Sequence, residues 1–222
     1  IEGSTTMASN GSFSAFEEGY PVWYFRGYQV DHLDEKGNPV FRDNDKNGVI
    51  DASDKAMIGK PMPDFTYGVT LAANYKNFDL LVFGNGSVGN DVFMSYSYNH
   101  IFYPLKEIYD QRWTPDGSTN RKYARPQLTN ADKYGLSDAY IFDGSYFRIK
   151  QIQLGYTFPK KLIKHALLEN VRVYASLDNF FLFTKYPGLD PEVSSTSTSG
   201  MGVDYGNYPT TKKVVFGLSV TF

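Results

Sequence analysis

An acidic segment in the first part of this 222-residue chain has the residue spacing of a calcium loop. Oxygen-bearing side chains occur at the first, third, fifth, ninth and twelfth positions counted from Asp43, and Gly48 stands at the sixth. Hard cations such as Ca²⁺ prefer carboxylate and carbonyl oxygens, and glycine at the sixth position allows the sharp turn that gathers them. The predicted metal ligands are Asp43, Asp45, Asn47, the carbonyl oxygen of Val49, Asp51 and Asp54.

Two features distinguish this segment from a calcium switch built on two helices. The twelfth position is Asp54 rather than the longer glutamate, and the sequence Ile-Gly-Lys-Pro at 58–61 ends any following helix within a turn. We therefore predict a structural Ca²⁺ ion that stiffens an external loop. The alternative is an Asx-rich turn of the same spacing that binds no metal tightly.

Aromatic residues in the loops form a second candidate site. The chain contains 18 Tyr, 17 Phe and 2 Trp, and this aromatic content of 17% favours a β protein over a helical one. Aromatic rings in loops can stack on sugar rings, although they also serve local packing. The candidate ligand-contacting residues are Tyr96, Tyr98, Trp113 and Tyr205.

No pattern in the sequence indicates covalent catalysis. The three histidines lie on different segments, away from any nucleophile motif, and the absence of cysteine excludes thiol catalysis and disulfides. A formal net charge of -2 without a basic block argues against nucleic acid as a partner. We therefore predict that the chain is not an enzyme and has no catalytic residues.

The elements that would position these residues are β-strands. Residues 1–19 are rich in Ser, Gly and Asn without a sustained period, which predicts a loop. Only residues 75–77 separate two strongly alternating segments, which predicts a tight antiparallel hairpin. The predicted strands lie near residues 20–30, 65–74, 78–87, 145–158, 171–182 and 212–222, and together they assign 20–222 to one β-barrel segment.

The predicted strand at 145–158 contains an irregularity. Its apolar positions change phase between Phe147/Ile149 and Ile152/Leu154. A strand can change phase where an extra residue is inserted, or where both of its faces are covered. We therefore expect either a bulge near Lys150 or a covered end.

The last predicted strand has the most regular alternation. Val214, Phe216, Leu218, Val220 and Phe222 are apolar at every second position, and the residues between them are small or mildly polar. A chain that ends on such a strand is typical of an outer-membrane barrel, whose apolar face meets lipid. A buried strand of a soluble sandwich is the alternative.

The lengths of the connections favour the barrel. Segments 31–64, 88–144 and 183–211 are long, whereas 75–77 and 159–170 are short. Outer-membrane barrels have long loops outside and short turns on the periplasmic side, while soluble sandwiches follow no such rule. Six strands are too few to close a membrane barrel, which needs about eight. We therefore expect this chain to be part of a larger barrel or assembly.

Several motifs resemble the C-terminal region of SusC-like TonB-dependent transporters. The resemblance covers roughly residues 17–222, with the motifs in the same order along the chain. They are the calcium-like loop followed by 58–68 (IGKPMPDFTYG), 75–80 (YKNFDL), 89–91 (GND), 112–115 (RWTP), 143–150 (DGSYFRIK), 154–156 (LGY), 173–176 (VYAS), 178–179 (DN), 184–186 (TKY), 188–192 (GLDPE) and the ending at Phe222.

The resemblance implies an all-β fold: an antiparallel transmembrane β-barrel of 22 strands with long extracellular loops, of which this chain supplies about the last six strands. It implies location in the bacterial outer membrane, contact with membrane lipid, and import of glycans or oligopeptides. It also implies a SusD-like surface lipoprotein as partner. The further partners that it implies are the N-terminal remainder of the barrel with its plug, and TonB, which would bind through a plug segment that this sequence does not contain.

Two further readings remain open at the level of the sequence. One is a soluble, calcium-stabilised β-sandwich that binds carbohydrate. The other is an extracellular hydrolase domain with a dockerin-like loop, which would require a second calcium repeat, whereas the sequence contains one.

Overall fold

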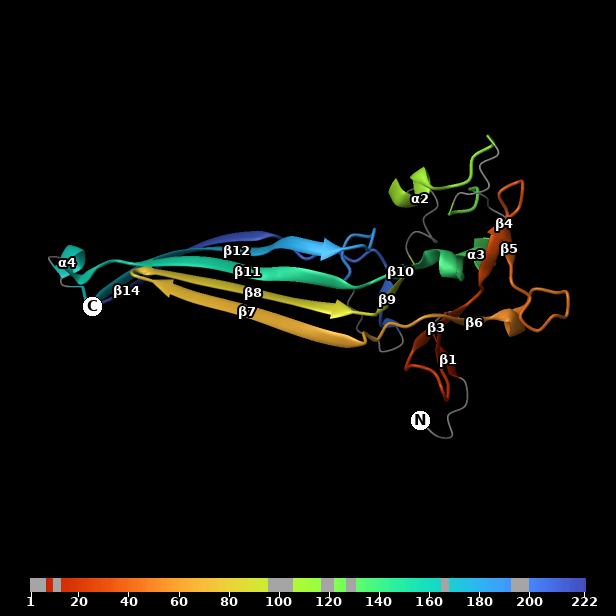
Figure 1. The fold of residues 1–222 in the computed structure, drawn as a ribbon, viewed down its shortest axis with the longest axis horizontal. Helices are drawn as coiled ribbons and strands as arrows, with labels where there is room; N and C mark the ends of the chain where they lie inside the picture. Colours follow the sequence, from red (N-terminus) through yellow and green to blue (C-terminus); the bar gives the residue numbers. More distant parts are fainter. Residues whose placement is uncertain are drawn as a thin grey trace. The chain divides into compact units, whose positions relative to one another are not determined.

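The computed structural model describes residues 7–9, 13–95, 106–116, 122–126, 131–164, 168–192 and 200–222. The chain forms two compact units, which are described separately. The first comprises residues 1–64, 89–145 and 185–208, and the second comprises 65–88, 146–184 and 209–222. Figure 1 shows that long strands dominate the second unit and short elements the first.

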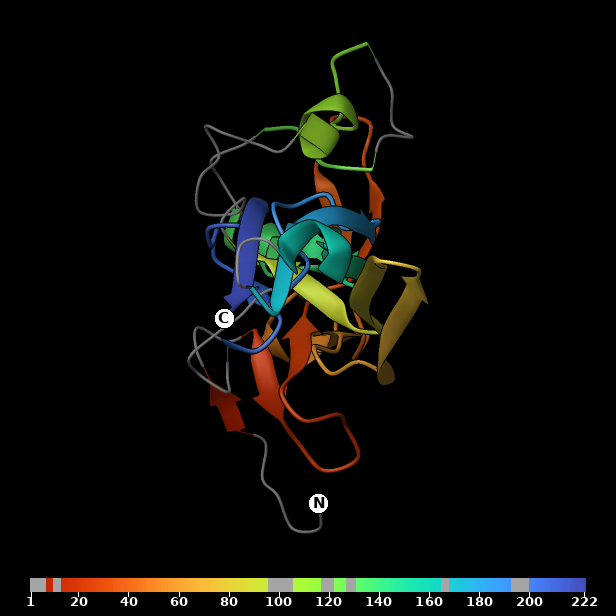
Figure 2. The ribbon, with the colours of Figure 1, turned by 90° about the vertical axis from the view of Figure 1, so that its left-hand side faces the viewer.

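The second unit is a five-stranded antiparallel sheet. Its spatial order is β14-β12-β11-β8-β7, and the short helix α4 (Lys160–Ile163) joins β11 to β12. Figure 2 views the strands from the end that carries α4. The strands are β7 (Phe65–Tyr75), β8 (Phe78–Val88), β11 (Tyr146–Thr157), β12 (Asn170–Thr184) and β14 (Lys213–Thr221).

The pairing register gives this sheet one apolar face. Residues directly opposite each other on neighbouring strands project to the same side, and successive residues of a strand alternate between sides. We call the resulting surface the apolar face. It carries Phe65, Tyr67, Val69, Leu71, Ala73 and Tyr75 of β7, Phe78, Leu80 and Val82 of β8, Phe147, Ile149, Ile152, Leu154 and Tyr156 of β11, Val173, Ala175, Leu177, Phe181 and Phe183 of β12, and Val214, Phe216, Leu218 and Val220 of β14.

The bulge predicted near Lys150 is confirmed. Ile149 pairs with Gly84 of β8, but Gln151 pairs with Phe83, so Lys150 is the extra residue of β11 at this step. The pairing with β12 shifts at the same point. The extra residue restores the phase, which keeps the apolar side chains before and after it on one face.

The opposite side, which we call the polar face, contains an ion pair held across three strands. Nε and Nη2 of Arg172 in β12 donate to Oδ1 and Oδ2 of Asp79 in β8, at 3.0 and 2.6 Å. Gly155 of β11 lies between them, and a Cβ there would lie 2.3 Å from Asp79 Oδ1. Glycine in the interior of a strand often marks such a close approach. The ion pair therefore depends on the missing side chain.

The two short connections of the sheet lie at one end. Lys76 and Asn77 join β7 to β8, as the predicted hairpin requires, and residues 158–169 join β11 to β12. The chain runs through its two long connections, 89–145 and 185–212, at the other end. This is the alternation expected for neighbouring strands of an up-and-down barrel.

The first unit consists of short strands and helical turns. A four-stranded sheet has the order β1-β2-β3-β6, a three-stranded sheet the order β10-β9-β13, and β4 pairs with β5. The elements are β1 (Met7–Ser9), β2 (Ser14–Phe16), β3 (Tyr24–Gly27), β4 (Val30–Leu33), β5 (Pro39–Phe41), η1 (Ala52–Asp54), β6 (Ala56–Gly59), β9 (Asp91–Met94), α2 (Lys106–Asp110), α3 (Ala131–Gly135), η2 (Asp138–Tyr140), β10 (Ile141–Asp143) and β13 (Val203–Asp204).

Strand β9 connects the two apolar clusters of the first unit. Val92 and Met94 pack with Ile108, Tyr123, Phe142 and Tyr186, whereas Phe93 packs with Phe25 and Val203. Because alternate side chains of a strand point to opposite sides, β9 contributes to both clusters. The first unit therefore has its own core.

Two sequence predictions are wrong in this unit. The segment 1–19, predicted as loop, contains β1 and β2, because the small buried residues Ser14 and Ala15 fit against β3. The segment 20–30, predicted as a barrel strand, contains the short β3 and the start of β4, and β3 pairs with β2 and β6 rather than with β7. Three of its aromatic residues are buried, since Tyr24, Phe25 and Tyr28 are at most 6% exposed. The five predicted segments from 65–74 onward lie on the strands of the second unit.

We predict that Gly155→Ala destabilises the sheet. The new Cβ would also lie 2.5 Å from Arg172 Nη2, so the ion pair must separate or the strands must shift, at a cost of about 1–3 kcal/mol. The free energy of unfolding is measured by urea titration of the full-length protein, with heat-modifiable gel mobility as the readout of the folded fraction. Gly68→Ala in β7 is the matched control, because a Cβ there has its nearest neighbour at 3.8 Å. Equal effects of the two substitutions would contradict the prediction.

Candidate functional site

The apolar face of the second unit has a layered distribution of side chains. Near the end with the long connections, Tyr67 stacks on Phe147 at 5.8 Å between ring centroids, and Phe147 stacks on Phe183 at 6.3 Å. Near the end with the short connections, Phe78 contacts Tyr156 at 4.8 Å. These two groups are the aromatic rows of the face. The aliphatic positions of the face, such as Leu71 and Leu154, lie between the rows in the register of the strands.

Many side chains of the apolar face are so exposed that contact with water would be energetically unfavourable. Leu71 is 58%, Leu218 66% and Phe216 80% exposed. A soluble sandwich would cover such a surface with a second sheet, whereas the sheet of the second unit is a single layer in the described residues. A contiguous apolar surface of this kind marks contact with lipid or with another protein.

The polar face has the opposite chemistry. Besides the pair of Asp79 and Arg172, Ser176 Oγ donates to Asp178 Oδ1 at 2.6 Å, and Gln151 Nε2 donates to Ser176 Oγ at 3.4 Å. Strands that alternate between apolar and polar sides in this way are typical of a barrel with lipid outside and a polar interior. With 11 residues each, β7 and β8 have the length of tilted transmembrane strands, about 9–11 residues.

The acidic loop of the first unit brings three of its predicted ligands together. One carboxylate oxygen from each of Asp43, Asp45 and Asp54 lies within 4.8 Å of the others. The turn that gathers them uses two left-handed residues, Lys46 with φ of 62° and Gly48 with φ of 84°. Glycine adopts this conformation without strain, as the sequence pattern requires at that position.

Backbone amides orient the carboxylates of this loop. Asp43 accepts from the amides of Gly48 at 2.7 Å and Asn47 at 3.2 Å. Asp54 is fully buried and accepts from the amides of Asn44 at 2.7 Å and Asp51 at 2.9 Å. These bonds hold the oxygens in place with no side-chain cation bonded to them among the described ion pairs.

The structure does not bring Asp51 into the cluster of three carboxylates. Its Oδ1 accepts from the amide of Ser53 at 2.8 Å, so Asp51 forms the N-cap of η1 in a reciprocal capping box with Asp54. Asn47 Oδ1 accepts from the amide of Val49 at 2.7 Å. Both side chains therefore make local turn contacts.

Hydrogen bonds also shift the acidity of this loop. The amide of Gly48 is the main cause that lowers the pKa of Asp43, and the hydroxyl of Ser53 is the main cause that lowers the pKa of Asp51. A carboxyl group with a lowered pKa is ionised at neutral pH. The ammonium group of Lys133 bonds to the carbonyl oxygen of Ile50 and adds positive charge beside Asp51.

The donor set fits a hard cation. Three carboxylates with defined directions, the Asn47 amide and the sharp turn at Gly48 supply oxygen ligands of the kind that Ca²⁺ prefers. Asp51 would have to turn away from Ser53, or act through a water molecule, to join them. The loop is therefore partly organised for a cation by its own hydrogen bonds.

The predicted aromatic ligand contacts fall in different places. Tyr96 and Tyr98 lie outside the described residues. The indole of Trp113 covers the turn at Gly37, where an added Cβ would lie 2.4 Å from its Cδ2, so this ring has a packing role. Tyr205 follows β13 and is 46% exposed. A role of these four residues in ligand binding stays a prediction.

Two features of the second unit were not foreseen from the sequence. One is the ion pair of Asp79 and Arg172, and the other is a lysine-lined hollow beside α4. The signals were present, because Gly155 interrupts a strong strand and three lysines occur within residues 160–164. The sequence does not show the register, which places Asp79 opposite Gly155 and Arg172 opposite Thr157, two residues further along β11.

No helix in the described ranges is both long and apolar enough to cross a membrane.

The exposed apolar face, its aromatic rows and the polar opposite face are typical of one class of protein, the integral β-strand proteins of an outer membrane. Comparison with curated proteins agrees. The chain is 33% identical over 204 residues to TonB-dependent receptor P3 of Formosa agariphila, covering 85% of this chain and 19% of that protein. It is 33% identical over 222 residues to TonB-dependent receptor SusC of Bacteroides thetaiotaomicron, covering 98% of this chain and 21% of SusC. No family model matches the chain.

Solved structures show the same fold. The chain superposes on the RagAB peptide transporter with a TM-score of 0.75 and 22% sequence identity, covering 100% of this chain and 25% of that one. The 'open-open' state of the RagAB peptide importer gives a TM-score of 0.74 at 22% identity, covering 100% of this chain and 25% of that one.

Over most of its length, the chain is therefore SusC-like TonB-dependent receptor sequence. Proteins of this family reside in the bacterial outer membrane, which confirms the predicted location. They are receptors and transporters rather than enzymes, in agreement with the lack of a catalytic motif. The chain spans about a fifth of the length of the curated relatives that it matches.

We predict that Asp54→Ala loosens the acidic loop even without metal. The substitution leaves the amides of Asn44 and Asp51 without their acceptor in a buried position, at a cost of about 1–3 kcal/mol. Native-state hydrogen exchange of the full-length protein in a chelator measures the opening of residues 43–55. Asp45→Ala is the control, since Asp45 is exposed and water replaces its contacts. Equal protection in the two variants would show that Asp54 does not hold the loop.

Proposed function

We propose that this chain forms part of the barrel wall of a SusC-like TonB-dependent transporter that imports glycans or oligopeptides across the outer membrane. The observation that carries the proposal is the exposed apolar face with its aliphatic positions between two aromatic rows. The similarity to SusC and to the fold of the RagAB peptide transporter supports it. In this proposal the apolar face meets lipid and the polar face meets the interior of the barrel.

The outer strands of the sheet require neighbours from the rest of the protein. In the described residues, β7 and β14 each pair on one side only. Unsatisfied backbone groups cost several kcal/mol each in lipid, so both edges must pair with further strands. We infer that the five strands of the second unit are adjacent strands of one larger barrel, for which 22 strands is the predicted total.

The partners follow from the same proposal. A plug domain and a TonB-contacting segment would come from the remainder of the full-length protein and couple import to energy. A SusD-like surface lipoprotein would bind on the external side, where outer-membrane barrels carry their long loops. Substrate would pass when the SusD-like lipoprotein, acting as a lid, and the plug change position. This chain would supply part of the barrel wall and part of the external surface.

The acidic loop would bind Ca²⁺ on that external side. Asp43, Asp45 and Asp54 supply the carboxylates, and the ion would offset their mutual repulsion. Lys133 of α3 donates a hydrogen bond to the carbonyl oxygen of Ile50 in this loop. A loop stiffened by Ca²⁺ would therefore also restrain α3.

We predict that Leu71→Arg impairs assembly and uptake. A charge on the lipid side of a barrel strand costs about 2–4 kcal/mol near the bilayer midplane. The measurements are the amount of heat-modifiable protein in the outer membrane and the uptake of labelled oligosaccharides and oligopeptides by a deletion strain complemented with each variant. The substrate class that enters with wild type distinguishes glycan from peptide import.

Thr70→Arg is the control for this experiment. Thr70 precedes Leu71 on the same strand but projects to the polar face, so its charge would meet the barrel interior. Assembly should therefore survive this substitution. If both variants assemble normally, the apolar face does not face lipid and the proposed function is wrong. If wild type imports neither substrate class, the transport proposal fails although the membrane location stands.

We predict that Ca²⁺ slows hydrogen exchange of residues 43–54 in the full-length protein. Asp45→Asn should raise the Kd for Ca²⁺ about tenfold, because calcium affinity depends on the charge of the ligands. A chelator should reverse the protection. Asp34→Asn is the matched control, since Asp34 also accepts backbone amide bonds in an Asx turn but lies outside the cluster. Exchange that is indifferent to Ca²⁺ would identify the loop as a metal-free turn.

A further inference from the structure

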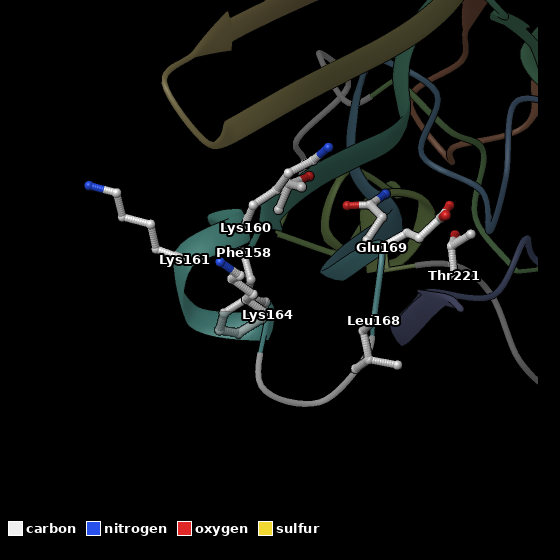
Figure 3. A pocket seen from close by; sticks show the side chains of 9 residues that line it. Phe158, Lys160, Lys161, Lys164, Leu168, Glu169 and Thr221 are labelled. Atoms are coloured by element: carbon white, nitrogen blue, oxygen red, sulfur yellow. The ribbon is translucent and has the colours of Figure 1, made fainter.

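A hollow lies at the end of the sheet that carries the short connections. Its volume is about 730 Å³, within the range of roughly 300–1,000 Å³ that is usual for small-molecule sites. It is bounded by α4, by Phe158 and by the segment that leads into β12 (Figure 3). All of these residues belong to the second unit.

The charged groups that line this hollow are mostly basic. Lys160, Lys161 and Lys164 contribute three ammonium groups, against the one carboxylate of Glu169. Thr157, Asn170 and Thr221 add hydroxyl and amide groups, and Phe158 and Leu168 add apolar surface. Among the described residues, these three lysines form no ion pair. The excess of positive charge favours an anion.

The hollow adjoins the edge of the apolar face. Phe158 lines the hollow and lies against Tyr156 of that face, with 5.3 Å between the ring centroids. Tyr156 in turn contacts Phe78, so Phe158 extends the aromatic row at this end. Aromatic rows mark the level where acyl chains give way to headgroups in outer-membrane barrels. The lysines of α4 therefore follow directly after this level.

The neighbouring hairpin carries a fourth cation to the same end. The amide of Thr157 donates to the Asn77 carbonyl oxygen at 2.8 Å, and Asn77 Nδ2 donates to the Thr157 carbonyl oxygen at 2.7 Å. These bonds fix the β7–β8 turn beside the hollow. Lys76 in this turn lies over the ring of Tyr75 at 5.2 Å. A basic rim therefore follows the aromatic row on two connections.

We propose that the lysine hollow binds the phosphate of an anionic phospholipid headgroup. The acyl chains of that lipid lie against the apolar face near Tyr156 and Phe78. This inference rests on the proposed function, because it requires the apolar face to meet lipid. Lysine side chains near a membrane surface reach the headgroups with their ammonium groups while their methylene stems stay among apolar atoms.

Charge and position together favour a lipid over an acidic protein segment. Phe158 belongs to both the hollow and the aromatic row, so one ligand with an anionic head and apolar chains contacts both. An acidic peptide would use the lysines but would leave the adjoining apolar surface uncovered. In Figure 3 Lys164 lies beside Phe158, whereas Lys161 extends away from the ribbon, where further headgroups of the leaflet would lie.

The test is photo-crosslinking of lipid to the full-length protein in nanodiscs. The photoreactive residue p-benzoylphenylalanine replaces Phe158 in one protein and Leu218 in a second. The nanodiscs contain equal amounts of phosphatidylglycerol and phosphatidylcholine, and mass spectrometry of the labelled peptide gives the ratio of the two adducts. We expect the ratio of phosphatidylglycerol to phosphatidylcholine adducts to be about fivefold higher at position 158 than at position 218. This factor corresponds to the attraction of one lysine for an anionic lipid.

Substitution of the lysines tests their role. In the triple variant K160Q/K161Q/K164Q, the ratio at position 158 should fall to that at position 218. The control, K212Q/K213Q, removes two lysines at the start of β14, the opposite end of that strand from Thr221 of the hollow, and should keep the preference. Heat-modifiable gel mobility shows whether each variant is folded. If the triple variant fails to assemble, the single variant Lys164→Gln should lower the ratio while Lys164→Arg retains it.

The outcomes separate this inference from the proposed function. Lipid adducts at both positions with the same ratio would overturn the headgroup site and leave the membrane-facing sheet intact. An adduct of protein at 158 in place of lipid would assign the hollow to a partner segment and also overturn the inference. Absence of lipid adducts at position 218 would contradict the proposed function itself.

Discussion

The pairing register of the five-stranded sheet determines what each of its side chains meets. A shift of one residue on any strand would move its apolar set to the polar side. The bulge at Lys150 is therefore essential, because it corrects the phase of β11 between Ile149 and Gln151. Without it, Phe147 and Leu154 could not share a face. The exposed apolar surface, the aromatic rows and the polar face all follow from this one geometrical condition.

The polar face shows how such a sheet accommodates charge. Arg172 and Asp79 neutralise each other across Gly155, so neither charge is left alone on a surface whose other side meets lipid in the proposed orientation. A second glycine has a similar role, since a Cβ at Gly217 would lie 2.1 Å from the ring of Tyr174. Glycine in these strands therefore makes room for large or charged neighbours. The polar face therefore depends on strand positions that carry no side chain.

The sequence predicted the parts of the fold that depend on local periodicity. Alternation over β7 and β14 indicated their strands and faces, and the phase change near Lys150 indicated the bulge. Alternation was a poor guide at 20–30, where aromatic residues fill a buried core. In the acidic loop the spacing predicted the cluster of Asp43, Asp45 and Asp54, but the preference of Asp51 for capping η1 competes with its place in the pattern. The lysine hollow forms where α4 and the ends of three strands meet, and such long-range meetings leave no local signal.

The connections of the sheet also determine the order in which it can form. The β7–β8 hairpin closes over two residues, and β11 and β12 close over a short segment containing α4, so both pairs form from local contacts. Pairing of β8 with β11 instead requires the ends of segment 89–145 to meet. Loop closure costs entropy that grows with length, and β topologies rich in distant contacts fold slowly. Folding of the first unit, which contains that segment and its own core, shortens the effective loop and promotes the joining of the two hairpins.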